Sequence, residues 1–187
     1  AGQLLTIGDL HNNAITLAYD GSNRLATVKD PGGRALTFGY NANNRIATVT
    51  DPTGAVVTYG YDPTTGDLTS VTDPLNHVRS YAYSKHRLAS FSDQNGKTQF
   101  TNTMDPVNRV TQQTDALGKS IAIAYSTPAA GVTQVTDPNA NADLYYFDLF
   151  HRTNDKIDPQ GHDVSYVYDG AGNLQKVVDP AFDTWQL

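Results

Sequence analysis

Apolar and polar residues alternate in short runs along the chain. In residues 34–40, Leu36, Phe38 and Tyr40 fall on one side of an extended backbone, and small or polar residues stand between them. A period of two places successive side chains on opposite faces of a strand. The pattern therefore predicts a strand over residues 34–40 with one apolar, largely aromatic face.

A second run, residues 45–50, follows the first after the polar segment 41–44, and it is rich in β-branched residues. Residues 51–54 read Asp-Pro-Thr-Gly. The proline presets its own φ and the glycine tolerates a positive φ, so this segment is typical of a turn. Residues 34–54 thus predict strand, turn, strand, turn, which is a β-hairpin.

The same hairpin pattern recurs every 20–22 residues along the whole chain. One aspartate closes each unit, and a tyrosine or another large apolar residue recurs in a second, parallel series. We therefore expect an all-β protein, residues 1–187 forming a single array of about eight 21–22-residue hairpins and about 16 strands. Contacts mainly between neighbouring units and a coiled, curved strip are also expected. The first series is Asp9, Asp30, Asp51, Asp73, Asp93, Asp115, Asp137, Asp158 and Asp179. The second series is Tyr19, Tyr40, Tyr61, Tyr83, Met104, Tyr125, Phe147 and Tyr168.

A residue that tolerates a left-handed backbone precedes the second strand of each unit. Glycine, asparagine and histidine are the residue types found there. We expect one such residue in every hairpin turn, and a longer loop at residues 127–131. The predicted left-handed positions are Asn23, Asn44, Gly66, His86, Asn108, Gly131, His151 and Gly172. Small residues such as Gly39 and Gly60 precede the tyrosines, which indicates either a close neighbouring layer or an exposed face.

Composition narrows the possible functions. The chain has no cysteine, which excludes disulfides, thiolate metal sites and cysteine catalysis. Its net charge of −6 disfavours a nucleic-acid module with a broad basic face. The sequence contains no run of 18 apolar residues, which is the length that a membrane-spanning helix needs. All 19 acidic residues are aspartate, and 14 of them lie on the two repeat series or directly after the second one. The negative charge is therefore mainly a consequence of turn chemistry.

The segment Tyr19-Asp20…Arg24-Leu25…Asp30-Pro31 resembles the YD repeat of RHS (rearrangement hot spot) proteins. The resemblance extends over about residues 4–182. The family includes bacterial polymorphic toxins, toxin-complex subunits and teneurins. It implies a hairpin strip that spirals into a hollow shell and, in toxin members, encloses a C-terminal toxic domain. The chain would then be a fragment of such a shell, with flanking repeats and the enclosed toxin as its partners. A location outside the cell, in the cell envelope or in a bacterial delivery system follows from the same resemblance.

The repeat residues are candidates for chemistry, and each has a structural alternative. Paired aspartates could act as acid and base or bind calcium, but turn formation explains them better. Tyrosines could stack on sugars, but we favour a packed ladder in which each tyrosine contacts the next. We predict no catalytic residue, metal or cofactor. The predicted structural ladder comprises Tyr19, Tyr40, Tyr61, Tyr83, Met104, Tyr125, Phe147, Tyr168, Asp30, Asp51, Asp73, Asp137, Asp158 and Asp179.

Five arginines share one phase of the repeat: Arg24, Arg45, Arg87, Arg109 and Arg152. They could form a stripe that binds an anionic glycan or phosphate. The favoured alternative pairs each arginine with the repeat aspartate of an adjacent unit. The function predicted from these observations is a non-enzymatic segment of a shell. The alternative is a secreted or cell-surface module that binds a glycan or a protein. In either case we expect Tyr61→Ala to be costly and Asp67→Ala, at an off-series position without an evident partner, to cost little.

Overall fold

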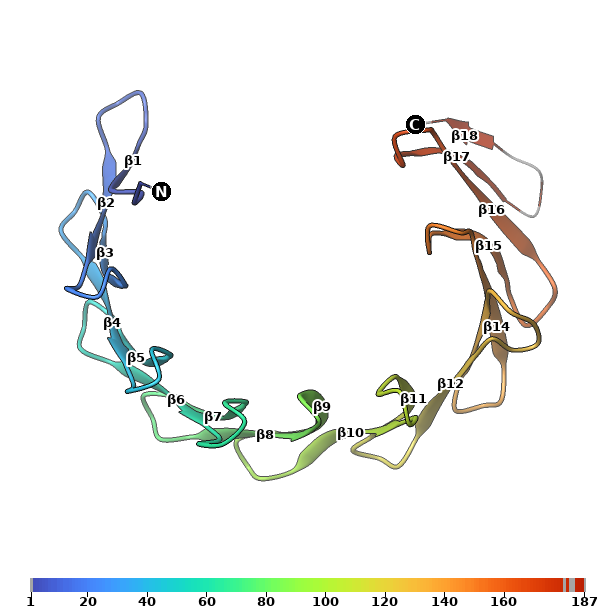
Figure 1. Cartoon of the computed structure of the whole chain (residues 1–187), viewed down its shortest axis with the longest axis horizontal. Coiled ribbons are helices and arrows are strands. Elements are labelled where there is room, and N and C mark those ends of the chain that lie inside the picture. Colours follow the sequence, from blue (N-terminus) through green and yellow to red (C-terminus); the bar gives the residue numbers. More distant parts are fainter. Residues whose placement is uncertain (1, 180, 182–183, 187) are drawn as a thin grey trace. The chain divides into compact units, whose positions relative to one another are not determined.

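The computed structural model describes residues 2–179, 181 and 184–186, and it is all-β, with no helix in this part of the chain. The chain divides into two compact units, Ala1–Lys97 and Thr98–Leu187, each of which is described by itself (Figure 1). No helix of the described residues is long and apolar enough to cross a membrane.

The first unit holds nine strands. They are β1 (Thr6–Gly8), β2 (Ala14–Tyr19), β3 (Leu25–Lys29), β4 (Ala35–Tyr40), β5 (Ile46–Thr50), β6 (Val56–Tyr61), β7 (Leu68–Thr72), β8 (Val78–Ser84) and β9 (Arg87–Ser92). Consecutive strands of the unit, from β1 to β9, pair in antiparallel fashion.

The second unit repeats this arrangement. Its strands are β10 (Thr98–Met104), β11 (Val110–Asp115), β12 (Ser120–Tyr125), β13 (Val132–Thr136), β14 (Ala142–Phe147), β15 (Thr153–Ile157), β16 (Asp163–Tyr168), β17 (Leu174–Val178) and β18 (Thr184–Gln186). Within each unit, the described strands contact only their neighbours in sequence, as the repeat predicted. The short strands β1 and β18 raise the total to 18, above the 16 expected from eight hairpins.

The turns share one geometry. In the turn after β3, the N–H of Asp30 donates to the carbonyl oxygen of Arg34, and the N–H of Gly33 donates back to the carbonyl oxygen of Asp30. Gly33 has a φ of 87°, which is the conformation that glycine adopts without steric cost. All eight positions predicted to be left-handed have positive φ, which confirms that reading of the sequence.

Three turns depart from this geometry. The turn after β6, residues 62–67, is one residue longer, and β8 and β9 are joined by a two-residue turn, Lys85–His86. These two changes explain why the spacing of the aspartate series lengthens to 22 and then shortens to 20. The expected longer loop lies between Tyr125 and Val132, where Ser126 has positive φ.

The small residue before each tyrosine is explained by the sheet itself. The ladder shifts register between Gly39 and Tyr40, and Gly39 lies opposite Thr48 of the neighbouring strand. A Cβ atom added at Gly39 would collide with Thr48 Oγ1, and one added at Gly60 would collide with Ser70 Oγ. The close neighbour is therefore a side chain of the same sheet, rather than another layer.

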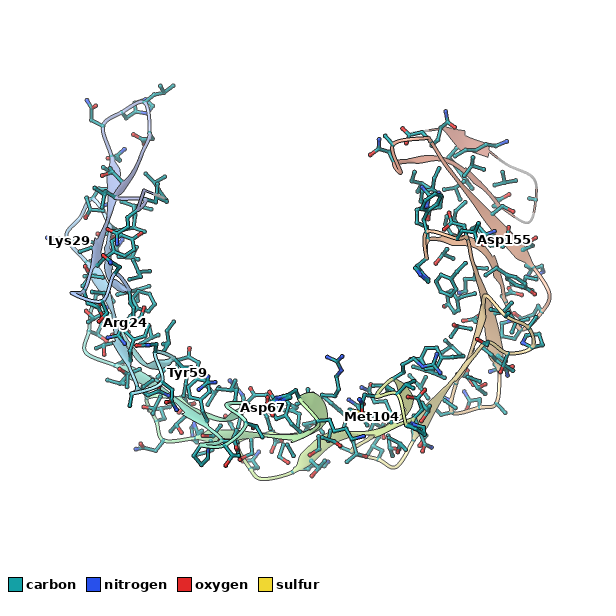
Figure 2. All side chains as sticks on the ribbon, in the orientation of Figure 1. Arg24, Lys29, Tyr59, Asp67, Met104 and Asp155 are labelled. Carbon is teal, nitrogen blue, oxygen red and sulfur yellow. The ribbon has the colours of Figure 1, made fainter. Side chains whose placement is uncertain are left out.

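The strands form a single layer without a closed core. Val132, 4 % exposed, is the one buried hydrophobic residue among those described. The accessible surface is 12372 Å², whereas a compact globular protein of 20.2 kDa exposes about 8,800 Å². In unit 1, Tyr59 and Lys29 lie on opposite faces of the strip, and so do Met104 and Asp155 in unit 2 (Figure 2). Stability must therefore come from strand pairing, turns and contacts between successive repeats.

Candidate functional site

The turn aspartates accept hydrogen bonds from donors of their own turn, and some of them use both carboxylate oxygens. Asp30 Oδ1 accepts the backbone N–H of Arg34 at 2.9 Å, and Oδ2 accepts Arg34 Nε at 2.6 Å. The Arg34 side chain is the main reason why the pKa of Asp30 lies below its ordinary value. Backbone or side-chain donors within the turn likewise lower the pKa of Asp51, Asp73 and Asp137. A carboxylate held in its charged form by its own turn is a structural group rather than a general acid.

Three of the five repeat arginines pair with an aspartate of their own turn. Arg24 Nη2 lies 2.8 Å from Asp20 Oδ2, and Arg152 Nη2 lies 2.7 Å from Asp148 Oδ2. Arg109 pairs in the same way with Asp105. The expectation that each arginine reaches the aspartate of an adjacent unit is therefore wrong. The turn brings residues four apart in sequence into direct contact.

The guanidinium groups of four repeat arginines reach the tyrosine of the next repeat. Each lies over the ring at a distance at which a cation is attracted to the π face. In these pairs an arginine lies over the ring, a contact that the predicted packing of tyrosine on tyrosine did not include. The distances from Cζ to the ring centroid are 4.3 Å for Arg24 and Tyr40, 5.8 Å for Arg45 and Tyr61, 4.2 Å for Arg109 and Tyr125, and 4.5 Å for Arg152 and Tyr168. We call these four pairs the arginine–tyrosine seam.

The tyrosine hydroxyl adds a second link between repeats. Tyr40 Oη donates to the carbonyl oxygen of Leu25 at 2.8 Å, and Tyr61 Oη donates to that of Ile46 at 2.7 Å. Tyr19, Tyr125 and Tyr168 make the same bond to the residue fifteen positions earlier. The tyrosine ladder predicted from the sequence does not include this bond, although the constant spacing of fifteen residues could reveal its partner.

The left-handed residue of the next turn completes the link. Arg24 Nη1 donates to Asn44 Oδ1 at 2.7 Å. Gly66 lies so close to the Arg45 guanidinium that an added Cβ atom would collide with it, and a Cβ atom at Gly172 would lie 3.5 Å from Arg152 Nη1. Each seam arginine thus links its own turn to the tyrosine of the next repeat. Arg24, Arg45 and Arg152 also lie close to the left-handed residue of the next turn.

Several predicted positions depart from the seam. Met104 and Phe147 lack the hydroxyl, and Arg87 opens β9 opposite Ser84. Asp67, for which the sequence indicated no partner, lies 2.8 Å from His86 Nδ1, and this corrects that expectation. No cluster of three or more potential metal ligands occurs among the residues that the structure describes.

A family model described as RHS Repeat matches residues 19–56 and 40–65. Residues 19–65 of the chain therefore carry the RHS repeat pattern. The matched part of the chain contains two pairs of the seam, Arg24 with Tyr40 and Arg45 with Tyr61. The other two pairs, Arg109 with Tyr125 and Arg152 with Tyr168, lie outside the matched residues.

Two solved structures illustrate the similarity. A crystal structure titled TcdB2-TccC3-Cdc42 is 14 % identical, covers 92 % of this chain and 9 % of its own, and has a TM-score of 0.49. The Photorhabdus luminescens Tc holotoxin pore with a mutated TccC3 is 16 % identical, covers 93 % and 9 %, and has the same TM-score of 0.49. The chain spans about a tenth of the length of these structures. No curated protein matches it.

Proposed function

We propose that the chain is a non-enzymatic wall segment of an RHS-type shell that encloses a C-terminal toxin or effector and helps to deliver it. The observation that carries the proposal is the single layer of hairpins joined to one another through the arginine–tyrosine seam. Such a layer exposes much surface for its mass and has no closed hydrophobic core among the described residues, which suits a wall better than an enzyme. The RHS pattern in residues 19–65 supports the same function.

The two faces of the layer suit this role. In unit 1, Leu36, Phe38 and Tyr40 alternate with residues of the other face, and Phe38 pairs with Val49 across the ladder. The opposite face presents small hydroxyl residues, such as Thr37 opposite Thr50. An apolar, half-exposed face of this kind stabilises a shell when it is turned away from bulk water.

Partners and location follow from the proposal. Flanking RHS repeats of the same polypeptide continue the wall, and the enclosed domain carries any catalytic activity. The polypeptide acts outside the producing cell, after secretion or delivery from the cell envelope.

Limited proteolysis of the natural polypeptide that contains this chain tests the proposal. We expect a segment C-terminal to residue 187 to stay intact for as long as the repeats do, as measured by mass spectrometry. The double variant Tyr61→Ala, Tyr168→Ala opens the wall at two seam positions and should shorten that protection. Rapid digestion of the downstream segment while the repeats remain intact would show that the wall encloses nothing.

A further inference from the structure

We call the side-chain contact between two successive repeats a joint. In one joint of unit 1, the acidic and basic side chains are exchanged relative to the seam, so this joint is inverted. Asp67 directly precedes β7, the place that Arg24 and Arg45 hold before β3 and β5. His86 takes the left-handed position that Asn44 and Gly66 take in the preceding turns, with a φ of 63°. A carboxylate thus replaces the guanidinium, and an imidazole replaces the residue that the guanidinium contacts.

The two side chains meet across the repeat boundary. Asp67 Oδ1 lies 2.8 Å from His86 Nδ1, although the residues are 19 positions apart. The Asp67 side chain is 15 % exposed and the His86 side chain is 64 % exposed. The irregular turns bring them together, because the turn before Asp67 is one residue longer and the Lys85–His86 turn has only two residues.

Other titratable groups surround the pair within unit 1. A recess of about 370 Å³ is lined by Asp67 and His86 together with Asp62, Tyr81, Tyr83 and Lys85. The Asp62 carboxylate accepts the N–H groups of Thr64 and Thr65 in its own turn. The hydrogen bond from His86 is the main cause that lowers the pKa of Asp67, while the charge of Asp62 opposes it. Burial raises the pKa of Tyr83, so this phenol stays neutral in acid and at neutral pH.

We propose that the contact between Asp67 and His86 is an acid-strengthened joint between two repeats. A neutral imidazole donates one hydrogen bond to the carboxylate, and a protonated imidazole adds an ion pair. Histidine gains its proton within the pH range of about 5–8, whereas arginine is charged throughout that range. The seam joints that use Arg24 and Arg45 therefore keep their charge as the pH changes.

The sign of the effect follows from the charges. The ion pair stabilises the joint when the imidazole is protonated, and this contribution is lost as the pH rises and the imidazole releases its proton. It is also lost in strong acid, where Asp67 becomes neutral. The pairs His77–Asp73 and His162–Asp158 have similar chemistry, but each lies within one turn and joins no two repeats.

Amide hydrogen exchange on the whole chain measures the joint directly. The informative variant is His86→Asn, because asparagine holds the left-handed position in the turns of Asn23 and Asn44 and can donate its amide to Asp67 without titrating. We expect the ratio of wild-type to His86→Asn protection factors in β8 and β9 to be about two- to fivefold larger near pH 5.5 than near pH 7.5. An unchanged ratio would overturn the proposal.

Two further variants separate this joint from other histidine effects. His77→Asn removes the titrating group of a single-turn pair, so the pH dependence at the Lys85–His86 turn should remain. The double variant Asp67→Arg, His86→Asn places at this joint the same residue pair as Arg24 and Asn44. The protection factors of β8 and β9 in this variant should therefore not change between pH 5.5 and pH 7.5. If His77→Asn abolished the pH dependence at β8 and β9, the effect would belong to the turn and the joint would be rejected.

Discussion

The hydroxyl of Tyr61 donates a 2.7 Å hydrogen bond to the carbonyl oxygen of Ile46, a residue of the preceding repeat. The guanidinium of Arg45 lies over the same ring. The two contacts hold opposite ends of one side chain, the ring and its hydroxyl, against the preceding repeat. Tyrosine at this position is therefore both a packing group and a specific hydrogen-bond donor.

We predict that Tyr61→Phe lowers the free energy of unfolding by about 1 kcal/mol, since it removes one hydrogen bond and keeps the ring. Tyr61→Ala should cost more, about 3 kcal/mol, because the ring packing is lost as well. Urea unfolding at neutral pH measures both. Tyr59→Phe is the matched control, since Tyr59 lies on the same strand without a hydroxyl bond to the described backbone. Equal losses for Tyr59→Phe and Tyr61→Phe would contradict the assignment.

The glycine at position 66 tests the contact between an arginine and the next turn. Gly66 and Gly54 both have positive φ, but a Cβ atom would collide with Arg45 at Gly66 and would meet open space at Gly54. We expect Gly54→Ala to cost about 1 kcal/mol from backbone strain alone. Gly66→Ala should cost clearly more in the same urea titration. Gly66→Asn also adds a Cβ atom and displaces the guanidinium, but it should cost less than Gly66→Ala, because asparagine tolerates positive φ and its Oδ1 can accept from the arginine as Asn44 does from Arg24.

The repeat period and the hairpin turns could be predicted from the sequence, because each turn needs a residue type that few others can replace. Asn23, Gly66 and His86 share nothing except tolerance of a left-handed backbone, and all three have it. The partners of the arginines could not be predicted in the same way. A periodic sequence gives every arginine the same phase relative to every aspartate, so pairing within a turn and pairing between repeats look alike. The inverted joint of Asp67 and His86 was hidden because it depends on two irregular turns.

The turn carboxylates should make the array sensitive to acid. The pKa of Asp51 is lowered in the folded chain, chiefly because the Thr53 hydroxyl donates to its carboxylate. The charged carboxylate therefore stabilises the fold at pH values above the pKa of the unfolded chain. This stabilisation is lost as the pH falls through the pKa of the folded chain. The same direction holds for Asp9, Asp20, Asp105 and Asp169. We expect the urea midpoint to drop as the pH falls below about 4.

Asp51→Asn is the matched variant for this effect. Asn41 occupies the equivalent place in another turn, and its Oδ1 accepts the N–H groups of Asn43 and Arg45 as an aspartate would. The variant should therefore keep the turn while removing the charge. We expect it to be less stable than the wild type at neutral pH and to approach the wild type in acid. A difference that stays constant with pH would show that the charge of Asp51 contributes nothing.

Arginine at the seam should not be replaceable by lysine. Arg152 contacts the Asp148 carboxylate and the ring of Tyr168, which requires a planar group with several donors. Arg34 also pairs with its own turn aspartate, but its side chain is 77 % exposed. We expect Arg152→Lys to cost about 0.5–1 kcal/mol and Arg34→Lys to stay within about 0.5 kcal/mol of the wild type.

Hydrogen exchange should place the loss from Arg152→Lys in β15, β16 and β17. Because the strands of each unit contact only their sequence neighbours, protection of β2 to β5 should not change. Loss of protection throughout the chain would instead mean that the repeats unfold as one cooperative body.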